Sequence, residues 1–194
     1  MINEFLKNNN ESSNSLSGIG SIIMDMQESL LTGIDRSAEL IDSVVLSVNL
    51  LSALKIPICL TEQVPEKLGI TIHRIKNTDL TAPVFSKNTF SAFGCISFNE
   101  WINTNNISHL LISGIETPIC IYQTCVEALR KGLKVTVLSD CVGARRLHDS
   151  DAIIAQLQSF GCCVIPVESV VYSLIRDSKH PSFKEITKLV RGRS

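Results

Sequence analysis

Short apolar runs alternate along this chain with longer segments whose apolar residues recur at helical spacing, and this alternation limits the possible folds. Uninterrupted apolar runs are typical of strands that are buried on both faces of a sheet. Strands that alternate with helices form a parallel sheet, with helices packed on both of its faces. We therefore predict an α/β fold with six strands, at 19–24, 56–60, 82–85, 110–112, 134–138 and 162–167.

Helices are predicted between and after these strands. Apolar residues at 34, 38, 41, 45, 48 and 51 form one face of a helix over 34–54, with Asp35 as its cap. The segment 71–81 is the one long connection without a clear pattern, and loops of that length often serve a site. The other predicted helices cover 93–103, 118–131, 148–160, 170–177 and 182–190.

Composition narrows the class of protein further. The chain has 194 residues, of which 44% are hydrophobic and 19% charged, which suits one globular domain with a buried core. We expect residues 1–17, rich in Asn and Ser, to be a flexible extension and residues 18–194 to form the domain. The net charge is −1 and no basic run occurs, which argues against nucleic acid as a partner.

Neither a membrane span nor a targeting signal is evident in the sequence. No run is long and apolar enough to cross a bilayer, so we expect no membrane partner. The first residues resemble neither a secretory signal nor a transit peptide, so we expect a cytoplasmic protein. The seven cysteines are odd in number and form no CxxC pair, which favours free thiols in a reducing compartment.

Cys120 stands at the start of the predicted helix 118–131, directly after a buried strand. Thr117 suits the N-cap and Pro118 the first helical position, which places the cysteine third in the helix. Backbone N–H groups are free there and the helix dipole favours negative charge, so we expect the thiol to ionise readily.

Two further ionisable side chains follow strands of the same sheet. Asp25 ends the first strand and Lys87 follows the third, while Cys120 follows the fourth. Sites in open α/β sheets form beyond the carboxyl ends of the strands. The three residues would offer a base, a cation and a nucleophile, and the N–H groups of the turn before Cys120 an oxyanion hole.

Each of these residues taken alone has an ordinary structural explanation, as a cap, a solvated lysine or a buried thiol. The distance between them is also a difficulty. A third strand two spacings away from the first lies about 10 Å from it, so the segment 87–93 has to fold over the site.

The motifs around these residues resemble the isochorismatase-like cysteine hydrolase superfamily over about residues 19–190. Within it, the chain is most similar to the eukaryotic isochorismatase-domain-containing proteins. The segments that carry the resemblance are Ile22-Ile-Met-Asp-Met-Gln27, Thr61-Glu-Gln-Val-Pro-Glu-Lys-Leu-Gly69, Ser86-Lys-Asn-Thr-Phe-Ser91, Gly114-Ile-Glu-Thr-Pro-Ile-Cys120 and His180-Pro-Ser-Phe-Lys-Glu-Ile-Thr-Lys-Leu189.

The resemblance implies a three-layer Rossmann-like fold with strand order 3-2-1-4-5-6 and a catalytic triad of Asp25, Lys87 and Cys120. It implies a cis peptide bond between Ile115 and Glu116, which turns the Glu116 amide, with that of Cys120, toward the oxyanion. It also implies a homodimer or a higher homo-oligomer.

Two departures from other members of the superfamily narrow the expected chemistry. Nicotinamidases carry an Asp-x-His metal motif after the second strand, where this chain has Thr61-Glu62-Gln63, and His73 stands alone. Isochorismatases proper lack a cysteine nucleophile. We therefore expect no metal or other cofactor, and covalent chemistry on a small amide or ureido compound.

Gln27 and Phe90 are predicted to line the substrate cleft, although core packing for Phe90 and backbone capping for Gln27 remain alternatives. A second hypothesis is an interaction protein that keeps the fold without activity. A dinucleotide-binding dehydrogenase is not favoured, because no G-x-G-x-x-G follows the first strand. A nuclease is not favoured either, because the metal ligands and the basic surface are missing.

Overall fold

The computed structural model describes residues 16–79 and 81–192. Six parallel strands form one sheet in the order β3-β2-β1-β4-β5-β6, which confirms the predicted fold class and strand order. The flexible extension predicted at 1–17 falls almost wholly outside the described residues. The strands are β1 (Ile19–Met24), β2 (Ile58–Gln63), β3 (Val84–Lys87), β4 (His109–Ile115), β5 (Lys134–Gly143) and β6 (Cys163–Ile165).

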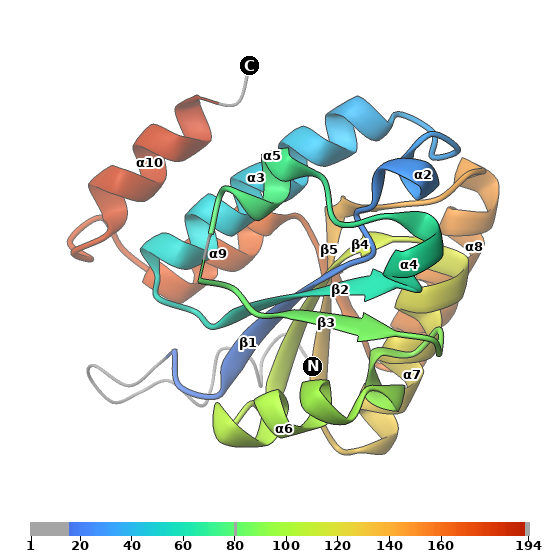
Figure 1. Cartoon of the computed structure of the whole chain (residues 1–194). Coiled ribbons are helices and arrows are strands. Elements are labelled where there is room, and N and C mark those ends of the chain that lie inside the picture. The colour runs from blue at the N-terminus through green and yellow to red at the C-terminus, as the bar shows by residue number, and fades with distance from the viewer. Residues whose placement is uncertain (1–15, 80, 193–194) are drawn as a thin grey trace.

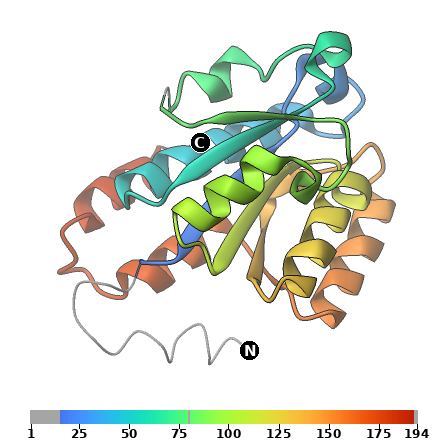
Figure 2. The ribbon, with the colours of Figure 1, turned by 60° about the horizontal axis from the view of Figure 1, so that its bottom comes forward.

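Helices cover both faces of the sheet (Figures 1 and 2). One face packs against α3 (Ser37–Ala53), α9 (Val167–Ile175) and α10 (Phe183–Arg191). The other face packs against α6 (Ile96–Thr104), α7 (Tyr122–Arg130) and α8 (Leu147–Ser159). The helix predicted over 34–54 is therefore present as α3, but it begins at Ser37, and Asp35 is not its cap residue.

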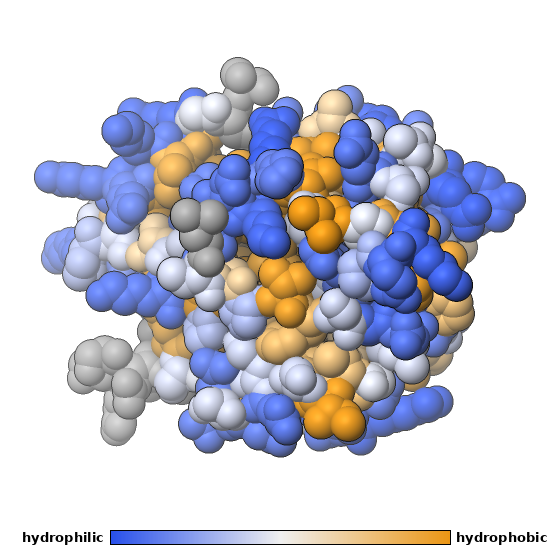
Figure 3. All heavy atoms as spheres, viewed as in Figure 1, coloured by the Kyte–Doolittle hydropathy of each residue, from blue (hydrophilic) through white to orange (hydrophobic). Residues whose placement is uncertain are grey.

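Every residue of the central strands β1, β2 and β4 is buried. The edge strands β3 and β6 are short, as exposed sheet edges commonly are. In the view of Figure 1, β3 lies in front, and the same view in Figure 3 shows hydrophobic residues in the middle of this face with hydrophilic ones on both sides.

The connections at the carboxyl ends of the strands hold short helices that lack a sequence period. These are α2 (Glu28–Leu31) after β1, α4 (Pro65–Leu68) and α5 (His73–Lys76) after β2, and the 3₁₀ turn η1 (Ala92–Gly94) after β3. The segment 71–81, predicted to be a patternless loop, thus contains α5, and Thr71 pairs with Gln27 as an isolated antiparallel bridge.

Phe98 of α6 anchors the connection that follows β3. Its ring is fully buried and meets the ring of Phe93 in η1 edge-on, with centroids 5.1 Å apart. It also meets Phe85 of β3 at 6.2 Å. These contacts hold both sides of the segment 87–93, which begins at Lys87.

The pairing of β4 with β5 is irregular near the carboxyl end of β4, a few residues before Cys120. The register with β5 shifts between Ile112 and Gly114. Gly114 has a φ of +108°, and a Cβ there would overlap the backbone oxygen and nitrogen of Met24. The peptide bond between Ile115 and Glu116 is cis. A single π-helical turn, η2 (Thr117–Ile121), then leads into α7.

Candidate active site

Asp25 follows β1 and is held by Thr61 of β2 through both its backbone and its side chain. Its backbone N–H donates to the carbonyl of Thr61 at 3.0 Å, and the Thr61 hydroxyl donates to Oδ1 of its carboxylate at 2.8 Å. Its φ of +58° is in the left-handed region, where the chain turns off the strand. The side chain is buried, so its charge needs partners in the protein.

Lys87 supplies that partner from the end of β3. Its Nζ donates to Oδ2 of Asp25 at 2.7 Å and to Oε1 of Gln63 at 2.6 Å. The side chain is buried and crosses β2, because Lys87 ends β3 opposite Gln63 in the register. The expected distance between strands one and three is thus spanned by the length of the lysine side chain itself.

Cys120 lies in η2, with its Sγ 3.6 Å from the Nζ of Lys87 and only 7% of the residue exposed. The structure therefore brings Asp25, Lys87 and Cys120 together. Thr117 is not the N-cap that we predicted, because its hydroxyl donates to the carbonyl of Gly143 on β5 at 3.1 Å. The cysteine sits in a π-helical turn, which in proteins often coincides with a functional site.

The thiol does not have the ionised character expected from its position. Burial raises the pKa of Cys120 to about 12, and the charge of Asp25 and a hydrogen bond to it act in the same direction. Lys87 opposes this shift by its charge and its hydrogen bond, but burial outweighs it. The resting site therefore holds a neutral thiol beside a carboxylate and an ammonium group, and a base is needed to form the thiolate.

Gln27 is turned toward the backbone. Its side chain is fully buried, its Oε1 accepts from the N–H of Gln63 at 2.8 Å, and its Nε2 donates to the carbonyls of Gln63 and Gly69 at 3.0 and 2.5 Å. This is the backbone-capping alternative, and it leaves the substrate-binding role of Gln27 as a prediction that this geometry does not favour.

Phe90 is 52% exposed, so core packing does not explain it. Its role in lining a substrate cleft stays a prediction. The Glu116 side chain pairs with Arg145, whose Nε donates to Oε2 at 2.9 Å. The oxyanion role of the Glu116 and Cys120 amides stays a prediction as well.

Sequence reasoning missed Gln63, which contacts Lys87 directly. From the sequence, the segment 61–63 was interpreted as part of the family resemblance and as the place where a metal motif is lacking, and no role was assigned to Gln63. In the part of the chain that the structure describes, no three His, Cys, Asp or Glu side chains are grouped as a metal site. The signal for Gln63 was its position as a polar residue at the end of an apolar strand that leads to the carboxyl edge.

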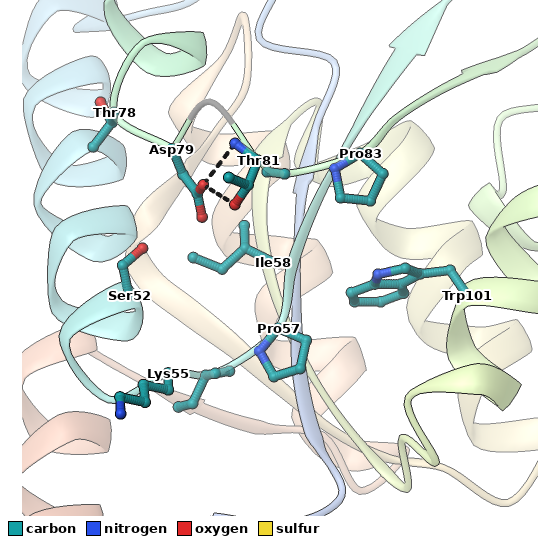
Figure 4. A pocket seen from close by; sticks show the side chains of 11 residues that line it. Ser52, Lys55, Pro57, Ile58, Thr78, Asp79, Thr81, Pro83 and Trp101 are labelled. Carbon is teal, nitrogen blue, oxygen red and sulfur yellow. Dashed lines mark hydrogen bonds between the residues drawn. The ribbon is translucent and has the colours of Figure 1, made fainter.

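Among the cavities formed by the described residues, two lie at opposite ends of the sheet. One of about 180 Å³ is lined by Glu116, Pro118, Ile119 and Arg145, beside the turn that carries Cys120. The other, of about 490 Å³, lies at the amino ends of β2 and β3 between Pro57, Pro83 and Trp101 (Figure 4). The second is therefore remote from Asp25 and Cys120, and neither cavity is lined by the thiol, the carboxylate or the ammonium group.

Within residues 16–79 and 81–192, no helix has the length and apolar character that crossing a bilayer would require.

Comparisons with known proteins identify the family of this chain. The family model of the isochorismatase domain matches residues 21–169. Isochorismatase domain-containing protein 2A of Mus musculus is 31% identical over 87% of this chain and 81% of its own length.

Two solved structures share the fold. The MAR1 ribonuclease of Caenorhabditis elegans has a TM-score of 0.84 at 30% identity and covers 90% of each chain. The YcaC gene product of Escherichia coli, described as an octameric hydrolase of unknown specificity, has a TM-score of 0.80 at 17% identity, covering 92% of this chain and 96% of its own.

Proposed function

This chain belongs to the isochorismatase family and has its hydrolase fold, and from that premise we propose that it is a metal-independent cysteine hydrolase. Its substrate would be a small compound with an amide or ureido C–N bond. Asp25 would act as the base, Lys87 as the fixed cation and Cys120 as the nucleophile. The observation that carries the proposal is the contact of all three groups at the end of the sheet, with Lys87 Nζ 2.7 Å from Asp25 and 3.6 Å from Cys120.

Because the pKa of Cys120 is raised, we propose that the thiol loses its proton only as the sulfur attacks the substrate. The thiol proton moves to Asp25 as the sulfur attacks the substrate carbonyl carbon, and the carbonyl oxygen becomes an oxyanion. The amides of Glu116 and Cys120 are the proposed donors to that oxyanion. The C–N bond then breaks, and the leaving amine takes the proton from Asp25.

Water completes the reaction. It attacks the thioester carbonyl, gives a proton to Asp25 and releases the acid, and the sulfur regains its proton. Lys87 transfers no proton in these steps, and its charge stabilises both the carboxylate and the developing thiolate.

Labelling with acrylamide tests the nucleophile, since this electrophile carries an amide group that suits the proposed site. We expect peptide mapping to show faster modification of Cys120 than of Cys59 and Cys141, which are at least as buried and serve as internal controls. Equal rates at the three thiols would sink the assignment of Cys120 as nucleophile.

Turnover decides between a hydrolase and an interaction protein that merely keeps the fold. A panel of small amides, carbamoyl compounds and esters should include at least one that is hydrolysed by the wild type and by Cys59→Ser but not by Cys120→Ser. Absence of any Cys120-dependent turnover would favour the interaction protein.

The ribonuclease name of one structural relative raises a competing outcome. RNA is a polyanion, whereas the one basic side chain of the triad, Lys87, is buried and already paired with Asp25. Incubation with single-stranded RNA in the same panel tests this directly, and Cys120-dependent cleavage would replace the amide proposal.

A further inference from the structure

Gln63 contacts Lys87 from β2, the strand that lies between those of Asp25 and Lys87. It is the last residue of β2, stands opposite Lys87 in the β2–β3 register, and is 8% exposed. Its Oε1 accepts from the Nζ of Lys87 at 2.6 Å, which is as close as the carboxylate of Asp25.

The orientation of the Gln63 amide is fixed by its other end. Nε2 donates to the carbonyl of Asn88 at 3.0 Å. A flipped amide would point its NH₂ group at the ammonium and its oxygen at that carbonyl, so two attractive contacts would become repulsive. The side chain therefore presents an acceptor to Lys87.

The Gln63 backbone is locked as well. Its N–H donates to Oε1 of Gln27 and its carbonyl accepts from Nε2 of the same side chain, at 2.8 and 3.0 Å. Gln27 itself is fully buried and bridges to Thr71. The acceptor that meets Lys87 thus stands on a rigid support that ties β2 to the segment after β1.

The ammonium group of Lys87 has three N–H donors, and the acceptors around it fix the directions in which they point. Asp25 takes one donor, and Gln63 takes another. With both in place, the remaining N–H points toward the sulfur of Cys120 and the carbonyl of Thr89, at 3.6 and 3.4 Å.

We propose that Gln63 is a positioning residue for the hydrolase reaction, which holds the Lys87 ammonium at the distance from Cys120 where its charge supports the thiolate. This rests on the proposed function, and it adds a fourth side chain to the site. Gln63 acts through Lys87 alone and touches no reacting atom.

The test is the rate of Cys120 modification by iodoacetamide between pH 7 and 10, measured by peptide mapping in the wild type and in Gln63→Met. Methionine keeps the length of the side chain and removes the acceptor. We expect the Cys120 rate to fall about tenfold at each pH, corresponding to a shift of the profile of roughly one unit toward higher pH. The exposed Gln156 provides the matched control, and Gln156→Met should follow the wild-type profile.

A double-mutant comparison shows whether the effect passes through Lys87. In Asp25→Asn/Lys87→Met, which removes both buried charges together, adding Gln63→Met should leave the Cys120 rate unchanged. A wild-type profile for Gln63→Met would overturn the proposal, and so would an effect that persists in this neutral background. If Gln63→Met does not fold, Gln63→Asn, whose amide is too short to reach Nζ, takes its place.

The same data separate this inference from the proposed function. The Cys120 rate is measured whether or not a substrate turns over. Coupling between Gln63 and Lys87 without any turnover would contradict the hydrolase function alone, whereas turnover without coupling would contradict only the role of Gln63.

Discussion

Asp25 and Lys87 act on the same thiol in opposite directions. Asp25 raises the pKa of Cys120 and Lys87 lowers it, on top of a raised value that burial sets. A measurement of activity alone therefore cannot distinguish the effect of Asp25 on the thiol from the effect of Lys87. Reactivity of the free thiol and turnover of a substrate must be measured side by side.

Replacement of Asp25 by asparagine should raise the reactivity of the Cys120 thiol and lower the turnover of a substrate. The amide removes the negative charge that raises the pKa of Cys120, so iodoacetamide modification at pH 7 to 8 should become faster than in the wild type. The same change removes the base, so turnover should fall on the order of 10²- to 10⁴-fold.

The exposed Asp35 supplies the matched control, and Asp35→Asn should leave both rates unchanged. A slower Cys120 modification in Asp25→Asn would contradict the assigned direction of the pKa shift.

The buried side chain of His109 affects the stability of the protein in acid. Its Nε2 lies 2.8 Å from the Thr136 hydroxyl, and burial lowers its pKa from 6.5 to about 4, with a smaller contribution from Lys134. Above pH 6.5 the imidazole is neutral in both the folded and the unfolded chain. As the pH falls through that window only the unfolded chain takes up the proton, so about 3 kcal/mol of stability is lost by pH 4.

We expect His109→Gln, which keeps a polar atom near Nε2, to flatten the loss of the free energy of unfolding between pH 6.5 and 4 in urea titrations. His148 is exposed, and His148→Gln should retain the wild-type pH dependence. Identical slopes for His109→Gln and the wild type would show that other groups dominate this window.

The end of β4 is the element on which the position of the Cys120 turn depends. Gly114 has a positive φ and packs directly against the backbone of Met24, one residue before Asp25. Gly132, after α7, also has a positive φ, of +81°, but has open space around it. The two glycines therefore separate the effect of backbone conformation from the effect of close packing.

Gly132→Ala should cost about 1 kcal/mol of unfolding free energy, because an L residue is strained at this φ. Gly114→Ala should cost on the order of 3 kcal/mol or more, because β1 and β4 must also move apart. Urea denaturation of both variants measures this, and equal costs would contradict a packing role for Gly114.

At the scale of elements, the sequence predicted the strands because short, uninterrupted apolar runs alternate with longer segments of helical spacing. Helices α2, α4 and α5 were not predicted, since four residues are too short to show a period. The end of β2 was missed because Thr61, Glu62 and Gln63 are polar yet buried. The position of Gln63 against Lys87 depends on strand register, and no local pattern contains that information.

The direction of the Cys120 pKa was predicted wrongly for a related reason. The helix start was visible in the sequence, but the burial that outweighs it arises from segments far away in the chain. Asp25, Lys87 and Cys120 themselves could be found, because each follows a strand that the sequence shows.

Assembly is a property of the whole molecule. Four large hydrophobic side chains that are at least half exposed lie on connections leaving the carboxyl ends of the strands; they are Ile70, Phe90, Ile96 and Leu147. Apolar side chains gathered at one end of a molecule mark surfaces that partners cover. The resemblance of the sequence to its family implies a homo-oligomer, and we expect a second copy of this chain to cover that end.

Sedimentation velocity at micromolar concentration should show a species heavier than the 21.3 kDa protomer. Ile96→Asp, at the most exposed of these positions, should shift the distribution toward monomer, whereas Phe160→Asp, at the opposite end of the sheet, should not. A wild-type protein that sediments only as monomer would refute the expectation.

The buried Lys87–Asp25 pair has a consequence for how the protein can change over time. Taking two charges out of water costs more than their attraction returns, so well-packed apolar side chains at 25 and 87 would give a more stable fold, whereas losing one partner alone is strongly destabilising. Any route that removes this pair one residue at a time therefore passes through a destabilised single variant. Selection for folding alone would preserve this pair in a lineage long after selection for catalysis had ended.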